Sequence, residues 1–139
     1  FMTSIDINIE STSKILNKNL RIKRIRVIQI NEIIDYRGNG YYIGDQLKDL
    51  GNFNIPDSKS VKSVKINFSS TFADDYLVVI IDGKRFYKLR NGFSYVINWE
   101  QEYDISLNTD NINIKAGISN TAEDNCEIRN GILSLTFYY

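Results

Sequence analysis

The sequence predicts an all-β domain in which about nine or ten short antiparallel strands pack as two sheets, a jelly-roll-like β-sandwich with one short helical turn. Three observations predict this fold class. Apolar and polar residues alternate along most of the chain, as they do in strands with one buried face. Asp-Gly and Asn-Gly dipeptides, which favour tight hairpin turns, separate these segments. The crossover helices that a parallel sheet requires are missing from the pattern.

The first half of the chain opens with a strand over residues 5–9, where isoleucine alternates with polar residues. A longer strand over 20–30 changes its apolar phase at 23–24, which predicts a bulge there. Gly51 is placed to end a helical turn. The remaining elements expected in this half are a loop over 37–40, a strand over 41–43, the helical turn over 45–50 and a strand over 64–68.

Residues 76–98 predict a three-stranded meander. Asp82-Gly83 and Asn91-Gly92 are each flanked by β-rich segments, and both dipeptides suit type I′ turns. Because two-residue turns set the register, the cross-strand partners can be written down. They are Ile81 with Lys84, Val79 with Phe86 and Leu77 with Lys88 in the first hairpin, and Arg90 with Phe93, Lys88 with Tyr95 and Phe86 with Ile97 in the second.

The last third of the chain predicts strands over 102–107 and 112–118 and a final hairpin closed by Asn130-Gly131. That hairpin would pair Ile128 with Leu133 and Cys126 with Leu135. Cys126 is therefore expected to be a buried, inert thiol. The last strand should turn one apolar face to the core and the other face to water. Its core residues would be Leu133, Leu135, Phe137 and Tyr139.

Composition excludes several functional classes. The 139 residues fit one domain, taken as 2–139 because Phe1 precedes Met2 and is expected to be a remnant of cloning. The 17 basic and 17 acidic residues balance, so no nucleic-acid partner is expected. No apolar run is long enough for a helical membrane span. Histidine is absent, so we expect neither an enzyme nor a cofactor.

Basic residues are concentrated between Glu10 and Glu32, where no acidic residue occurs. We interpret this stretch as the solvated face and turn of an ordinary strand. The alternative is a patch for phosphate or another anionic partner. The residues concerned are Lys14, Lys18, Arg21, Lys23, Arg24 and Arg26.

Carboxylates are the remaining candidates for catalysis or metal binding. The pairs Asp74/Asp75 and Glu100/Glu102 are the ones a glycosidase-type mechanism could use, but we interpret them as solvated acids. Calcium needs only oxygen ligands, so a structural calcium ion is kept as an alternative to plain turn residues. Its ligands would come from Asp104, Asp110, Asn111 and Asn113, or from Glu123, Asp124 and Asn125.

Both faces of the predicted meander are apolar, although a sheet exposed to water needs only one apolar face. One face, taken for the core side, carries Tyr76, Val78, Ile80, Tyr87, Leu89 and Val96. The other would be covered by the chain itself, by a second subunit or by a ligand, in that order of preference. As a hypothetical interface it comprises Leu77, Val79, Ile81, Phe86, Phe93, Tyr95 and Ile97. Cation–π pairs Lys88–Tyr95 and Arg90–Phe93 would lie at its rim.

We expect a non-enzymatic structural or assembly module that works through a protein partner or self-association, in a virion or on an extracellular surface. Abundant Ile, Asn, Lys and Tyr are typical of AT-rich genomes, which include those of many phages. The alternative is a lectin-like carbohydrate-binding module, by analogy with other sandwich domains. Its ligand platform would comprise Tyr41, Tyr42, Tyr95, Asn98, Trp99 and Asp104.

Overall fold

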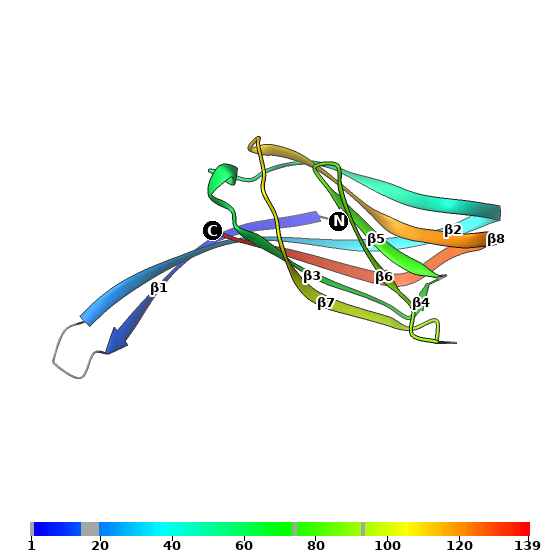
Figure 1. Ribbon diagram of the computed structural model, residues 1–139, viewed down its shortest axis with the longest axis horizontal. Helices are drawn as coiled ribbons and strands as arrows, with labels where there is room; N and C mark the ends of the chain where they lie inside the picture. The colour runs from blue at the N-terminus through cyan, green and yellow to red at the C-terminus, as the bar shows by residue number, and fades with distance from the viewer. Residues whose placement is uncertain (1, 15–19, 74, 93) are drawn as a thin grey trace.

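The computed structural model describes the backbone of residues 2–14, 20–73, 75–92 and 94–139, and within these the side chains of 26–35, 43–73, 75–92, 94–121 and 127–139. Antiparallel strands make up nearly all of this chain, and they pack as two layers (Figure 1), which confirms the predicted all-β sandwich. The strands are β1 (Met2–Lys14), β2 (Leu20–Asn54), β3 (Ser63–Ser70), β4 (Phe72–Ala73), β5 (Tyr76–Ile81), β6 (Lys84–Leu89), β7 (Ile97–Asp104) and β8 (Asn111–Tyr138). The described helical element is a 3-10 turn, η1 (Ser58–Ser60).

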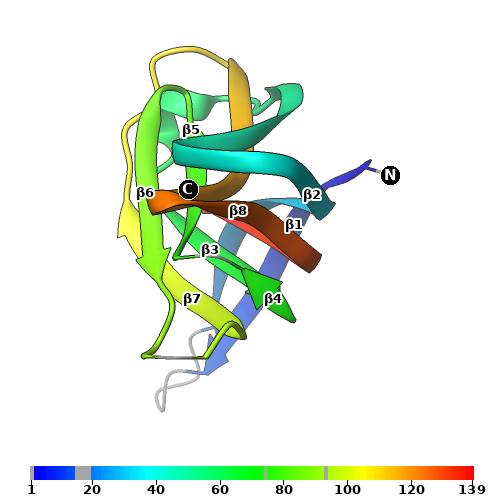
Figure 2. The same cartoon turned by 90° about the vertical axis from the view of Figure 1, so that its right-hand side faces the viewer.

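Two long strands, β2 and β8, belong to both layers. Residues 27–34 of β2 pair with 131–138 of β8 in one layer, and 44–54 of β2 pair with 111–120 of β8 in the other. The register shifts between these stretches, where both strands pass from layer to layer at the end that Figure 2 faces. Layer A is defined as β1, the first half of β2, the second half of β8, β3 and β7. Layer B is the second half of β2, the first half of β8, β5 and β6.

The hydrophobic core lies between the layers and is built from alternate residues of each strand. Layer A contributes Ile28, Ile30, Val64, Ile66, Phe68, Leu133, Leu135 and Phe137, all fully buried. Layer B contributes Leu77, Val79, Ile81, Ile112, Ile114 and Ile118. The predicted core face of the last strand is therefore confirmed for its three fully buried members, and Tyr139 packs against the core as a partly buried residue.

The first hairpin of the predicted meander is confirmed and the second is wrong. Strands β5 and β6 pair in the predicted register, and Asp82 and Gly83 both have the positive φ that a type I′ turn requires. Strand β7 does not return to β6 but pairs with β3, with Trp99 opposite Phe68. Gly92 still has a positive φ, so a local turn forms there without a hairpin.

Three further expectations are corrected, two of them because β2 and β8 pair over most of their lengths. Residues 37–50 belong to β2 rather than to a loop and a helical turn, and Gly44 and Gly51 lie at register shifts with positive φ. No bulge occurs at 23–24, since β1 and β2 pair without a shift. Gly131 closes no hairpin: it faces Ile34, whose carbonyl oxygen would lie 2.4 Å from an added Cβ.

Strand β1 pairs with β2 alone, and their outer part extends beyond the sandwich as a two-stranded arm (Figure 1). The last pair between β2 and β8 joins Val27 to Tyr138, so residues 20–26 of β2 have β1 as their partner strand. The basic stretch of the sequence falls on this arm, apart from Lys18, which lies outside the described residues. Of its members, the structure describes the side chain of Arg26, whose guanidinium lies 4.5 Å from the Tyr139 ring centroid.

Replacing Leu77 by Ala tests whether layer B is covered by the chain's own core. Leu77 is 0% exposed, so its truncation leaves a cavity and should lower the free energy of unfolding by about 2–5 kcal/mol. Leu89→Ala, in the same hairpin but 51% exposed, is the matched control and should change it by about 0.5 kcal/mol or less. Urea denaturation of the two variants measures the difference, and equal effects would contradict this packing.

Candidate functional site

Most of the hypothetical interface is buried inside the molecule. Leu77, Val79, Ile81 and Ile97 are at most 3% exposed and belong to the core cluster, so the interface hypothesis does not hold for them. The reason is that layer A covers this face of the β5–β6 hairpin. Phe86 is partly buried, with its ring centroid 4.8 Å from that of Tyr103.

The face of the hairpin that packs against layer A is thus the one assigned to the interface, although Val78, assigned to the core side, is also fully buried. Tyr87, Leu89 and Val96, taken for the core side, are exposed. Tyr95 is 43% exposed and keeps its place at the surface, whereas Phe93 lies outside the described residues. Of the predicted interface, Tyr95 is therefore the described member that a partner can reach.

The predicted ligand platform does not come together. Trp99 is 2% exposed, and its ring nitrogen donates a hydrogen bond to the Tyr103 hydroxyl over 3.1 Å. Asn98 and Asp104 are exposed, but Asn98 alternates with Trp99 on β7 and lies on the opposite face. The side chains of Tyr41 and Tyr42 lie outside the described residues.

Two of the calcium candidates that the structure describes, Asp110 and Asn113, are engaged in polar contacts with other side chains. Asp110 accepts hydrogen bonds from the Ser58 backbone N–H (3.0 Å) and hydroxyl (2.8 Å), which hold the pKa of its carboxyl below the usual value. Asn113 donates to Asp49 over 3.0 Å. Within the described residues no three metal-ligating side chains cluster, and the side chains of Glu123, Asp124, Asn125 and Cys126 lie outside them.

One member of each carboxylate pair is likewise held by neighbouring groups. Asp75 accepts hydrogen bonds from the backbone N–H and the hydroxyl of Thr121, both over 2.7 Å. Glu100 forms a 2.8 Å ion pair with Lys65, and the hydrogen bond from Lys65 lowers the pKa of Glu100. Asp74 lies outside the described residues, and Glu102 is exposed near the end of β7.

A stack of aromatic and guanidinium groups, named here the arginine–aromatic ladder, lies where β4 meets the segment between β6 and β7. The rings of Phe72 and Tyr95 are stacked with centroids 4.6 Å apart and planes 11° from parallel. The Arg90 guanidinium carbon lies 4.5 Å from the Tyr95 centroid, and that of Arg129 lies 4.9 Å from the Phe72 centroid. Because each ring covers the inner face of the other, the guanidinium groups cover the two outer faces.

Backbone hydrogen bonds hold the ladder in place. Ala73 donates to the carbonyl of Tyr95 over 2.9 Å, and Thr71 donates to that of Arg129 over 3.1 Å. The segment before Tyr95 is fixed as well, since Arg90 donates to the carbonyl of Asp75 over 2.8 Å. The rings are therefore positioned by β4, β8 and the segment between β6 and β7 before any partner arrives. Sequence analysis did not identify Phe72 and Arg129 as part of a site, because the pairing of β4 with β8 is what brings them together.

A second cluster occupies the outer face of layer B. Arg85 on β6 donates two hydrogen bonds to the Asp45 carboxylate on β2, over 2.9 and 3.0 Å. The Arg85 guanidinium carbon lies 5.1 Å from the centroid of Tyr87, whose ring meets that of Tyr76 edge-on at 5.6 Å and 83°. With Ser119 on β8, these side chains line a depression of about 270 Å³, named here the Tyr87 hollow.

The electrostatics of the Tyr87 hollow are those of a fixed ion pair. The hydrogen bond from Arg85 lowers the pKa of Asp45, and a hydrogen bond from the Ser119 side chain acts in the same direction. The same pair raises the pKa of Arg85. Sequence reasoning missed this site because Asp45 was taken for the start of a helical turn, whereas pairing with Ser119 places it beside β8.

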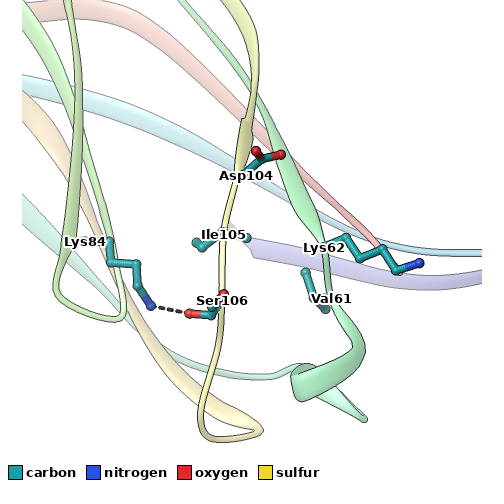
Figure 3. Close-up of a pocket in the computed structure, with 6 residues that line it drawn as sticks. All are labelled: Val61, Lys62, Lys84, Asp104, Ile105 and Ser106. Carbon is teal, nitrogen blue, oxygen red and sulfur yellow. Dashed lines mark hydrogen bonds between the residues drawn. The ribbon is translucent and has the colours of Figure 1, made fainter.

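A larger depression of about 450 Å³ is lined by Val61, Lys62, Lys84, Asp104, Ile105 and Ser106 (Figure 3). Lys84, from the β5–β6 turn, donates a hydrogen bond to the carbonyl of Ser106. Lys62 extends away from Lys84 on the other side of the segment that carries Asp104 and Ser106 (Figure 3). Among the residues that the structure describes, no aromatic ring lines this depression, and the ammonium group of Lys84 is already engaged.

Comparison of the chain with known protein families, curated proteins and solved structures finds no match. Within the part of the chain that the structure describes, no helix is long and apolar enough to cross a membrane.

The Asp45–Arg85 pair should make stability depend on pH in acid. The pKa of Asp45 is lowered in the folded state. The contribution of its ionised carboxylate to the free energy of unfolding is therefore complete above the ordinary Asp pKa of about 3.9, and it is lost as the pH falls through the lower, folded-state pKa. We expect Asp45→Asn to lower the free energy of unfolding by about 1 kcal/mol or less at neutral pH. This loss should become progressively smaller below about pH 4. An NMR titration of the Asp45 carboxyl carbon checks the cause: Arg85→Gln should raise this pKa, and an unchanged value would contradict it.

Proposed function

We propose that this chain is a non-catalytic contact module that works through protein–protein contacts in a larger assembly, such as a virion. The observation that carries the proposal is the arginine–aromatic ladder with the exposed Leu89 and Val96 nearby in sequence. Tyr, Phe and Arg are the residue types enriched at interfaces, where a few buried anchors contribute most of the binding energy. A preordered ladder also loses little side-chain entropy on binding.

A second copy of the chain is the partner we favour. The formal net charge of zero means that two copies do not repel one another at long range. The ladder contains both halves of a cation–π pair, so a two-fold axis can place the guanidinium group of one copy against the aromatic edge of the other. Two-sheet sandwiches also recur among capsid proteins, which supports the virion setting by analogy of fold.

Light scattering coupled to size-exclusion chromatography, over a concentration series, tests the proposal. We expect a multiple of the 16.1 kDa chain mass, with dissociation on dilution. Truncating both Arg90 and Tyr95 to Ala should weaken this association by at least about tenfold, because the stack then loses one ring and its guanidinium cover.

Asn98→Ala is the matched control for that experiment, because Asn98 is exposed on β7 and lies outside the ladder. It should leave the association unchanged. A 16.1 kDa monomer at every concentration would overturn self-association. An oligomer that the double variant leaves intact would show that the contact lies elsewhere.

A further inference from the structure

We propose that the Tyr87 hollow binds a neutral sugar ring. This inference goes beyond the proposed assembly function and rests on a different group of side chains, Tyr76, Arg85, Tyr87 and Ser119 with the adjoining Asp45. The volume of about 270 Å³ is close to the lower end of the range of roughly 300–1,000 Å³ for small-molecule sites, which suits one ring of a glycan.

The aromatic side of the hollow is Tyr87, which is 56% exposed although it packs edge-on with Tyr76 and has the Arg85 guanidinium carbon 5.1 Å from its ring centroid. An aromatic ring carries partial negative charge on its face and attracts polarised C–H groups. A pyranose presents such C–H groups on one face of its ring. The contact with Tyr76 holds the Tyr87 ring in position, so a ligand need not order it on binding.

The polar side of the hollow is the Asp45–Arg85 pair, which offers both hydrogen-bond acceptors and donors in a fixed geometry. The ionised carboxylate of Asp45 has about four lone-pair sites, of which Arg85 occupies two and the Ser119 side chain a third, so one acceptor site is left for a ligand. The guanidinium group has five N–H donors, of which this pair uses two. Neighbouring sugar hydroxyls need this combination, because one can donate to the carboxylate while the next accepts from the guanidinium group.

Charge favours a neutral ligand over an anionic one. Asp45 offsets the charge of Arg85 through two hydrogen bonds. A phosphate, sulfate or carboxylate would therefore have to compete with Asp45 for the guanidinium group and approach a carboxylate of like charge. A protein partner would have to bury roughly 1,000 Å² or more, far beyond the hollow itself, and stays an outcome of the test.

The experiment is an NMR titration of the ¹⁵N-labelled chain with neutral methyl glycosides of glucose, galactose, mannose and N-acetylglucosamine. We expect at least one of them to shift the amide signals of Tyr76, Arg85, Tyr87 and Ser119 in a saturable way. Methyl phosphate is the anionic probe and should produce no saturable shift there. No shift with any glycoside, saturable shifts only elsewhere, or tighter binding of methyl phosphate would each overturn the proposal.

Two variants locate the site. Tyr87→Ala should weaken binding at least about tenfold, because the stacking ring is lost. Leu89→Ala is the matched control: Leu89 follows Tyr87 by two positions on β6, is 51% exposed and lies outside the hollow lining, so binding should be unchanged. If the Tyr87→Ala variant binds the glycoside as tightly as the unmodified chain does, the proposed site is overturned. The NMR readout does not depend on oligomeric mass. A failed sugar titration therefore does not contradict self-association through the arginine–aromatic ladder, and a monomeric mass in light scattering does not contradict the sugar site.

Discussion

The pairing of β8 with β2 through both layers is the constraint on which the rest of the structure depends. β8 lies between β2 and β3 in layer A and between β2 and β5 in layer B, so every inner strand takes its position from it. Two glycines permit the close approach. A Cβ on Gly117 would lie 2.1 Å from the Gln46 carbonyl oxygen, and one on Gly131 would lie 2.4 Å from that of Ile34. Both contacts are with backbone, which cannot move aside without breaking the ladder of hydrogen bonds.

Both candidate surfaces lie close to the stretch where β8 passes between the layers. Ser119 at the Tyr87 hollow precedes this stretch, and Arg129 of the arginine–aromatic ladder follows it. Asp75 connects the two: its backbone carbonyl accepts from Arg90, while its carboxylate accepts from Thr121 on β8. Asp75 has a φ of 47°, a left-handed conformation that non-glycine residues seldom adopt and that tertiary contacts must hold. The two surfaces are thus tied to one strand, and the geometry of either depends on the register of that strand.

The parts of the fold that local chemistry determines could be predicted from the sequence. Asp82-Gly83 sets the β5–β6 register, because a two-residue turn leaves no choice of partners, and alternation identifies the buried face of the last strand. Local signals failed where pairing is distant. Asn91-Gly92 turns the chain, but nothing local shows that β7 then joins β3. Gly51 resembles the end of a helical turn, but it lies, like Gly44, at a register shift in β2. The candidate sites were missed for the same reason: each is assembled from strands far apart in sequence.

The two surfaces share one arrangement, a guanidinium group over an aromatic ring with a carboxylate beside it. Asp45 pairs with Arg85, Asp75 lies 4.0 Å from Arg90, and Glu127 forms an ion pair with Arg129. Neither surface therefore attracts a partner by net charge, and recognition falls to ring faces and directed hydrogen bonds. They differ in what is left open. Both rings of the arginine–aromatic ladder are covered on both faces, which leaves edges and guanidinium groups for a broad protein surface. Tyr87 remains more than half exposed beside a depression, which suits the ring of a small ligand.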